Sequence, residues 1–175
     1  VACCFFNKCY EANVETDKME FSSCEFKDCI CLNSKFEKVY FTDVLFENCD
    51  FSNTMFYECN FVRVTFRNCK LVGSNLCNVN MYNILIDNTN GSYANMSLGT
   101  YKEVCFSESK LSNSVIQEVI FKDVEFDKTN LIASQLCRTN LNGIDVSNCD
   151  ITGVAISQDY IKGLIVNEMQ AVELS

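Results

Sequence analysis

Apolar side chains recur at every fifth position along most of the chain. Between Phe21 and Val166 this spacing defines 30 positions, and 28 of them hold Phe, Leu, Ile, Val, Met or Tyr; the exceptions are Cys31 and Gly91. Counting Phe6, 13 of the 14 Phe residues lie in this register. Neither the 3.6-residue period of a helix nor the 2-residue period of a strand places every fifth residue on one face. A chain that turns a corner every five residues does, so the pattern predicts a solenoid.

A second inward position precedes each large apolar residue by two. It holds a small or apolar side chain, as in the run Val39, Val44, Cys49, Thr54 and Cys59. Each five-residue unit therefore contributes one large and one small side chain to the predicted core. The remaining positions are mostly polar and are expected to face solvent.

Several units resemble the repeat of the pentapeptide-repeat family, A-(D/N)-(L/F)-x-x. Clear examples are Cys49–Asn53 (CDFSN), Cys59–Arg63 (CNFVR) and Thr139–Gly143 (TNLNG), and the resemblance covers Glu20 to Ser157. It implies an all-β fold, a right-handed quadrilateral β-helix with four units in each square coil of 20 residues. Residues 1–175 would then be a single domain. Within it we expect an irregular N-terminal coil or cap over 1–20, regular coils over 21–157, and a C-terminal cap with a short helix over 158–175.

Wrapping the chain at 20 residues per coil stacks the large residues into columns. The aromatic columns of the N-terminal half are Phe21/Phe41/Phe61, Phe26/Phe46/Phe66 and Phe36/Phe56. Each buried ring contributes roughly 1.5–3 kcal/mol of transfer free energy. A row of rings could also bind a ligand, but a solenoid core accounts for it fully.

Two places depart from the pattern. Glu11 and Thr16 occupy large inward positions, where burial without partners is unfavourable. This is why we expect the first coil to be distorted. In the middle of the chain, Asn90-Gly91 is a strong turn signal, and Gly91 has no side chain for the core. Residues 87–95 are therefore predicted to form either a pinched corner or a loop of whole units that bulges from the coil.

Cysteine placement indicates thiols within the core. Eight of the 13 Cys residues occupy the small inward position, and Cys9, Cys29, Cys49 and Cys69 form one column. A thiol is a small, readily buried group. Pairs such as Cys29/Cys31 lack the spacing of a closed zinc site and the chain has no His, so we expect free thiols and no metal.

No residue pattern supports catalysis. The chain has no His for proton transfer near neutral pH, no glycine-rich phosphate loop and no G-x-S-x-G motif. We therefore expect no catalytic residues, no cofactor and no enzyme activity. We also find no apolar run of membrane-spanning length and no basic-then-apolar leader, which predicts a cytoplasmic protein without a membrane partner.

Acidic residues gather on one side of the predicted coil. The formal net charge is −9, and four adjacent outward columns hold 11 acidic but only four basic residues, a net charge of −7. The other eight columns between Phe21 and Val166 hold 6 acidic and 8 basic residues. The predicted partner-binding acidic face comprises Asp43, Glu47, Asp87, Glu103, Glu108, Asp123, Glu125, Asp127 and Asp145.

A rod with negative charge along one side is similar to the Qnr and MfpA branch of the family. That resemblance implies a DNA mimic that binds DNA gyrase or topoisomerase IV and modulates quinolone susceptibility, without direct nucleic-acid binding. The alternatives are a solvated face on a generic protein-interaction scaffold, or a structural repeat protein without gyrase activity. The resemblance also implies a homodimer through the C-terminal end, where an open coil needs a cap or partner. The predicted dimer contacts are Ile161, Leu164, Val166, Met169 and Val172.

Overall fold

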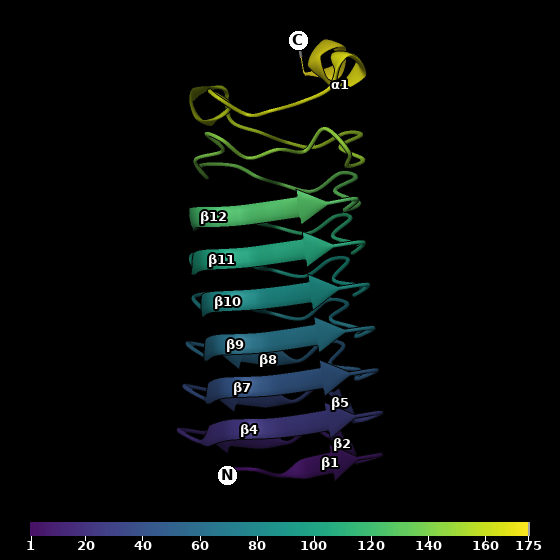
Figure 1. Cartoon of the computed structure of the whole chain (residues 1–175), viewed down its shortest axis with the longest axis vertical. Helices are drawn as coiled ribbons and strands as arrows, with labels where there is room; N and C mark the ends of the chain where they lie inside the picture. The colour runs from purple at the N-terminus through teal and green to yellow at the C-terminus, as the bar shows by residue number, and fades with distance from the viewer. Residues whose placement is uncertain (175) are drawn as a thin grey trace.

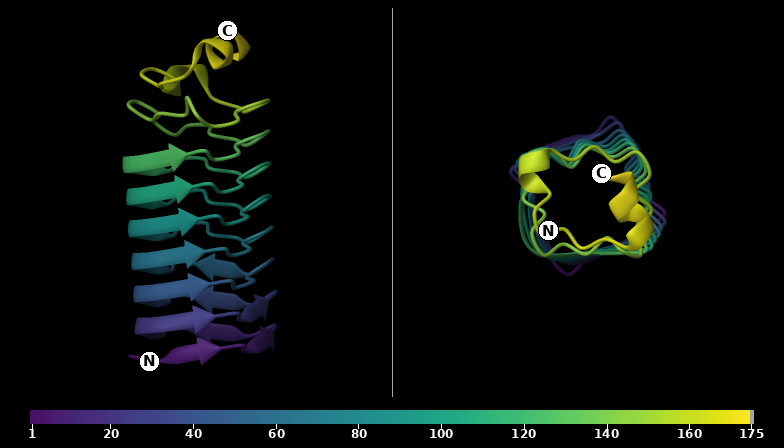
Figure 2. Two further views of the ribbon diagram at one scale, coloured as in Figure 1. Left: turned by 45° about the vertical axis from the view of Figure 1, so that its right-hand side comes forward. Right: turned by 90° about the horizontal axis from the view of Figure 1, so that it is seen from above.

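Parallel strand ladders with an offset of 20 residues organise the fold. Phe21 pairs with Phe41, Phe41 with Phe61, and the same offset holds in every strand pair. In the computed structural model, which describes residues 1–174, the chain rises as a right-handed solenoid (Figure 1). Seen along its axis, the solenoid has four sides (Figure 2). The quadrilateral β-helix expected from the sequence is confirmed.

Three parallel sheets cover the sides of the coil. Isolated bridges between residues 20 apart extend the ladders beyond the named strands. The largest sheet contains β1 (Phe5–Asn7), β4 (Glu20–Lys27), β7 (Tyr40–Glu47), β9 (Asn60–Arg67), β10 (Asn80–Asp87), β11 (Thr100–Ser107) and β12 (Ile120–Asp127). The second contains β2 (Tyr10–Ala12) and β5 (Ile30–Leu32). The third contains β3 (Glu15–Asp17), β6 (Lys35–Glu37) and β8 (Met55–Tyr57). Near the C-terminus lie the 3-10 helix η1 (Gln158–Tyr160) and the helix α1 (Glu168–Glu173).

A residue with positive φ marks each corner. From Cys3 to Gly143 every fifth residue has φ in the left-handed region, whatever its type. Asn53 is typical: its φ is 56°, and the turn closes with a hydrogen bond from Thr54 N to Phe51 O at 3.1 Å. A positive φ at the third residue of a turn is the signature of a type II turn. In the eight-residue strands the same corner residue, for example Asp43, drops out of the pairing, so each strand covers parts of two sides.

Phenyl rings fill the N-terminal half of the core in a regular arrangement. Between coils they stack: the ring centroids of Phe41 and Phe61 are 5.0 Å apart with planes 5° from parallel. Within one coil they meet edge to face, as Phe41 and Phe46 do at 5.5 Å and 70°. Both arrangements are favourable for aromatic pairs. The core predicted from the five-residue register is confirmed, since these rings are buried.

The small inward positions do more than fill space. Cys69 Sγ donates hydrogen bonds to Phe46 O at 3.4 Å and Arg67 O at 3.3 Å, and Thr129 Oγ1 donates to Phe106 O at 2.9 Å. Thiols and hydroxyls in this column thus bond backbone carbonyls that the ladders leave under-used. All 13 cysteines are free, as predicted. Burial raises the pKa of the Cys59 thiol to about 11, which keeps it neutral near pH 7.

The first coil is regular, which corrects the prediction of an irregular coil over residues 1–20. β1, β2 and β3 pair with β4, β5 and β6 at the usual offset. Glu11 is exposed and Thr16 only half-buried, although both occupy inward positions of the register. Their polar groups therefore keep contact with solvent.

Residues 87–95 also follow the coil, neither pinched nor bulging. Asn90 N donates to Cys69 O at 2.9 Å and Gly91 N to Lys110 O at 2.7 Å, so the ladder continues through the Asn-Gly pair. A Cβ at Gly91 would lie 2.9 Å from the Leu111 side chain of the next coil, so Gly fits this position, and a second glycine, Gly99, makes room for a ring. Tyr101 is fully buried with its hydroxyl donating to Met96 O at 2.9 Å, and a Cβ at Gly99 would lie 2.8 Å from its ring.

The C-terminal segment closes the last coil through side-chain hydrogen bonds. Asn167 caps α1, and its side chain and that of Gln170 form a capping box. Gln170 is buried, and its Nε2 donates to Val146 O and Cys149 O, both at 2.9 Å. The predicted short C-terminal helix is confirmed. Within residues 1–174, neither helix has the length and apolar character needed to cross a membrane.

Removing one stacked ring tests the core. We expect Phe46→Ala to lower the free energy of unfolding by about 3–5 kcal/mol, as truncations of buried Phe do. Phe5, the one Phe outside the register, is 59% exposed and supplies the control. Phe5→Ala should change stability by no more than about 0.5 kcal/mol. Chemical denaturation followed by circular dichroism measures both, and equal losses would contradict the inward register.

Two serines in one column give a second test. Ser114 Oγ is buried without a hydrogen-bond partner among the described residues, whereas Ser74 Oγ donates to Leu71 O at 2.7 Å. Ala94 already occupies the same column. Ser114→Ala should leave stability unchanged or raise it by about 1 kcal/mol, because an unpaired buried hydroxyl is unfavourable. Ser74→Ala should lower it by about 1 kcal/mol, and the opposite order in thermal melts would refute this assignment.

Candidate protein-binding surface

The predicted acidic residues lie along the seven-stranded sheet. Asp43 and Glu47 are on β7, Asp87 on β10 and Glu103 on β11. Asp123, Glu125 and Asp127 are on β12, Asp145 lies one coil beyond Glu125 in the same column, and Glu108 lies at the corner after β11. The structure therefore brings the nine predicted acidic residues together on the side of the coil that the seven-stranded sheet covers and at the corners next to it.

Ion pairs divide this face into two parts. Each of its four basic residues pairs with an acid one coil away. Arg63 contacts both carboxylate oxygens of Asp43, at 2.5 and 2.8 Å, which lowers the pKa of Asp43. The other pairs are Lys27–Glu47 at 2.8 Å, Arg67–Asp87 at 3.4 Å and Lys128–Glu108 at 3.4 Å. Such exposed pairs add little stability, but they neutralise the charges that a partner would meet.

Four neighbouring carboxylates keep their charge uncompensated. Asp123, Glu125, Asp127 and Asp145 form no ion pair with any residue in the described range 1–174. We call these four the carboxylate cluster. Asp127 accepts a hydrogen bond from Asn148 Nδ2 at 2.8 Å. Asp145 accepts one from Ser147 N at 2.8 Å, and hydrogen bonding to Ser147 lowers the pKa of Asp145.

A small hollow borders the cluster where the strand ladder ends. β12 is the last strand of its sheet, and the next coil does not pair with it as a strand. The hollow has a volume of about 260 Å³ and is lined by Phe121, Asp123, Val124, Asn140, Asn142, Gly143 and Ile144. It combines an apolar wall, a carboxylate and two side-chain amides. This combination suits a long cationic side chain, whose alkyl stem packs while its charged head meets oxygen atoms.

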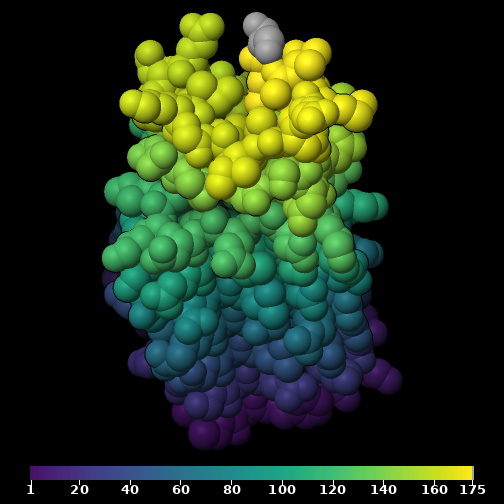
Figure 3. Space-filling view, turned by 45° about the horizontal axis from the view of Figure 1, so that its top comes forward, coloured from purple at the N-terminus to yellow at the C-terminus, as the bar shows by residue number. Residues whose placement is uncertain are grey.

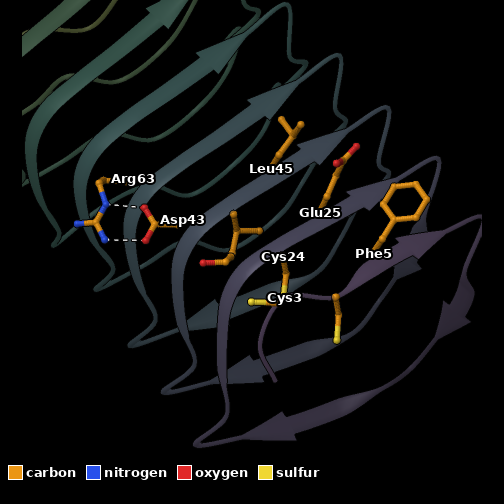
Figure 4. A pocket seen from close by; sticks show the side chains of 10 residues that line it. Cys3, Phe5, Cys24, Glu25, Asp43, Leu45 and Arg63 are labelled. Atoms are coloured by element: carbon orange, nitrogen blue, oxygen red, sulfur yellow. Dashed lines mark hydrogen bonds and ion pairs between the residues drawn. The ribbon is translucent and has the colours of Figure 1, made fainter.

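A larger and shallower hollow lies at the N-terminal end of the same face (Figure 4). Its volume is about 630 Å³. Phe5, Glu25 and Leu45 follow one another in a single outward column, and the Asp43–Arg63 ion pair lies across from them. Because that acid is already paired, this end of the face offers less free negative charge than the carboxylate cluster.

The predicted dimer residues separate into two groups. Leu164 and Val166 pack partly against the core, and Ile161 is also half-buried. Met169 and Val172 on α1 are 84% and 78% exposed. Figure 3 shows the C-terminal segment lying over the end of the coil. Met169 and Val172 are therefore free to contact another molecule, whereas Leu164 and Val166 mainly hold the segment in place.

Sequence reasoning missed two structural roles. Gln170 lies between apolar residues in the helix, and nothing in its neighbours shows that it bonds the last coil. The Asn167–Gln170 capping box was a signal that could have placed the helix start, because Asn followed three residues later by Gln is a known N-terminal signature. The ion pairs could also have been predicted, because Asp43 and Arg63 are 20 residues apart and therefore lie on adjacent coils.

Comparison with solved structures returns other solenoids of low sequence identity. HetL, a pentapeptide repeat protein involved in heterocyst differentiation regulation from Nostoc sp. strain PCC 7120, is 10% identical over 93% of this chain and 91% of its own, with a TM-score of 0.51. A trypsin-treated form of QnrB1, a plasmid-mediated fluoroquinolone resistance protein, is 18% identical over 88% and 92%, with a TM-score of 0.38. A pentapeptide repeat protein from the Arabidopsis thaliana thylakoid lumen is 11% identical over 54% and 56%, with a TM-score of 0.29. The likeness to HetL supports the fold.

Family models give the more direct result. No curated protein matches the sequence. The model of the pentapeptide repeat region matches residues 2–76, 19–96 and 39–116, and the model of pentapeptide repeats in eight copies matches residues 105–143. Together these matches run through the ladders, corners and stacked core described above, and the chain belongs to the pentapeptide-repeat family.

Proposed function

We propose that this protein binds a basic protein surface through its acidic face, in the place that DNA takes on such a surface. The observation that carries the proposal is the carboxylate cluster. Its four acids are adjacent, largely exposed and unpaired within residues 1–174, whereas most other acids of the face are neutralised by bases on the protein itself. Negative charge without internal partners attracts cationic groups on another molecule.

The geometry around the cluster fits such a partner. Asp123, Glu125 and Asp127 follow one another along β12, and Asp145 lies one coil, about 4.8 Å, from Glu125, so the four carboxylates are closely spaced. A DNA duplex offers a basic groove a comparable pattern, a rod with phosphates along it. The hollow beside Asp123 adds an apolar wall at Phe121 and Val124 for the stem of a Lys or Arg side chain.

Type II topoisomerases are the partner class to test first. The acidic face and the short C-terminal helix resemble those of the Qnr and MfpA proteins, and that resemblance implies binding to gyrase or topoisomerase IV and an effect on quinolone susceptibility. A protein-interaction scaffold without charge mimicry is the second candidate. Salt separates the two, because exposed charges are screened over about 10 Å at 0.1 M ionic strength while apolar contacts are not.

Reversing the carboxylate cluster tests the proposal. The variant Asp123→Lys, Glu125→Lys, Asp127→Lys and Asp145→Lys changes the charge of the face from −7 to about +1. We expect wild-type affinity for purified gyrase to fall as salt rises, and the variant to bind about tenfold more weakly or not at all. Surface plasmon resonance measures the affinity, and a supercoiling assay with and without a fluoroquinolone measures the consequence.

A matched control moves the same charge elsewhere. Glu15, Glu20, Asp159 and Glu168 are exposed acids outside the acidic face. Reversing these four to Lys gives the control the same net charge as the cluster variant. Its affinity for gyrase should stay close to that of the wild type, apart from the weaker long-range attraction that both variants share. Circular dichroism establishes that both variants are folded. Equal binding by the two variants, or no binding by wild type at any salt concentration, would show that the cluster is a solvated face.

The same proposal includes a homodimer through the C-terminal end. Met169 and Val172 expose most of their side chains on α1, and Ile165 is 48% exposed nearby in sequence. Apolar side chains gathered at the end of a solenoid favour contact with a second end of the same kind. A two-fold contact of this type would place two acidic faces on one elongated particle.

A charge placed on α1 tests the dimer. Met169→Asp should convert the wild-type dimer into a monomer at micromolar concentration, because it would bury a carboxylate in the contact. Met55→Asp, on the side of the coil where Met55 is 38% exposed, is the control and should remain dimeric. Multi-angle light scattering gives the masses. A wild-type protein that is already monomeric would refute this assembly.

A further inference from the structure

A polar groove runs along one corner of the solenoid, parallel to its axis. Its volume is about 560 Å³, within the usual range for small-molecule sites. One wall is a row of outward side chains at the first residues of β7, β9 and β10, strands that lie one above another in Figure 1: Tyr40, Asn60 and Asn80. The other wall is the column of corner residues with positive φ just before this row: Lys18, Lys38, Glu58 and Asn78.

This groove belongs to the side of the coil and not to an end of the chain. Tyr40 pairs with Glu20 on one neighbouring strand and with Asn60 on the other. Asn60 pairs in turn with Asn80, and Asn80 with Thr100. The ladder therefore holds the backbone of the row in place from both directions. A preorganised wall of this kind reduces the ordering that a ligand must impose when it binds.

Tyr40 presents an aromatic ring to solvent at this wall. The residue is 53% exposed, and its ring contacts no other ring and no cation within residues 1–174. Tyr82, further along the same side, differs because Lys102 Nζ lies 4.6 Å from its ring centroid. The hydroxyl of Tyr40 also forms no hydrogen bond with another described residue. The side chain thus offers an apolar platform with a free polar group at its edge.

The side-chain amides next to this ring are oriented but not saturated. Asn80 Nδ2 donates to Asn60 Oδ1 at 3.0 Å, and Asn60 Nδ2 donates to Glu58 O at 3.5 Å. Asn80 Oδ1 and the whole side-chain amide of Asn78 are left without partners in the part of the chain that the structure describes. Because an amide carries both donors and an acceptor, these groups can give and receive hydrogen bonds along the groove.

The charges that line the groove are compensated by neighbours on the protein. Lys18 pairs with Asp17 at 3.4 Å. Lys38 lies 3.5 Å from Glu37 and 3.7 Å from Glu58. A phosphate or carboxylate on a ligand would have to compete with these pairs for the two ammonium groups. The lining therefore favours a polar ligand without charge.

We propose that this groove binds a neutral oligosaccharide. The C–H face of one sugar ring packs on Tyr40, and hydroxyls of the following sugar bond the amides of Asn78 and Asn80. Sugar hydroxyls both donate and accept, which matches the free groups of the amides. The row rises by about 4.8 Å per coil, so it extends beyond one sugar ring and suits a chain of linked sugars. This site lies apart from the carboxylate cluster and does not depend on the proposed function.

Neutral and anionic oligomers test the chemistry of the groove. Cellotetraose, maltotetraose and chitotetraose are uncharged, whereas a uridine tetranucleotide carries rings and hydroxyls together with phosphates. Isothermal titration calorimetry on the wild-type chain should give a Kd of about 1 mM or lower for at least one sugar, and binding about tenfold weaker for the nucleotide. Absence of binding by all three sugars would overturn the proposal, and so would a nucleotide that binds as tightly as the best sugar.

Substitutions in the two walls locate the bound sugar. Tyr40→Ala should weaken the tightest of the three sugars about tenfold, while Tyr40→Phe, which keeps the ring, should stay within about threefold of the wild type. The double variant Asn78→Ala and Asn80→Ala should weaken it about fivefold through lost hydrogen bonds.

Tyr93→Ala is the matched control. Tyr93 is 65% exposed at a different corner of the coil, so its removal should leave the affinity for the sugar unchanged. Thermal melts establish that all variants fold. Wild-type affinity in Tyr40→Ala, or an equal loss in Tyr93→Ala, would show that the sugar does not bind in this groove, which would also overturn the proposal.

Discussion

The backbone ladder between residues 20 apart is the interaction on which the rest of the structure depends. To keep it in register, the chain must turn at every fifth residue, and each turn requires a positive φ. Residues such as Lys38, Glu58, Arg63 and Leu98 adopt it with φ between 52° and 61°, although L residues with a Cβ are disfavoured there by roughly 1 kcal/mol or more. The ladder and the core offset this cost at each corner. The core in turn depends on the ladder, because only this spacing brings Phe41 and Phe61 into parallel contact at 5.0 Å.

The five-residue register was sufficient to predict the solenoid, its core and its outward columns. It failed where side chains compensate each other across coils. Gly91 suggests a break when considered alone, yet the ladder continues through it, and a Cβ there would lie 2.9 Å from the Leu111 side chain of the next coil. Glu11 and Thr16 suggest distortion, but Glu11 is exposed and Thr16 only half-buried, so their polar groups keep contact with solvent in a regular coil. Contacts between coils and the exposure of single side chains decide these cases, and a five-residue repeat pattern does not show either.

The position of the acidic face was predictable from the sequence, but the amount of uncompensated charge on it was not. Column positions identified the acidic face, whereas the division between paired and unpaired acids depended on side-chain contacts. Seven of the ion pairs join residues 20 apart, for example Lys38–Glu58, Asp50–Lys70 and Glu118–Arg138. The same rule that stacks the core therefore arranges the surface charges. Asp123, Glu125, Asp127 and Asp145 form none of these pairs with another described residue, and this concentrates most of the face's free charge near β12.

The fold has two nested repeats, and they place different limits on change in chain length. The core recurs every five residues, so inserting or deleting one unit would still present a large and a small side chain at each inward position. The surface recurs only every 20 residues. One extra unit before β12 would rotate every later column by a quarter turn, moving Asp123, Glu125 and Asp127 to a different side from Asp43 and Glu47. A family of such rods can thus lengthen by single units and remain folded, but it retains an aligned binding face only when it lengthens by whole coils.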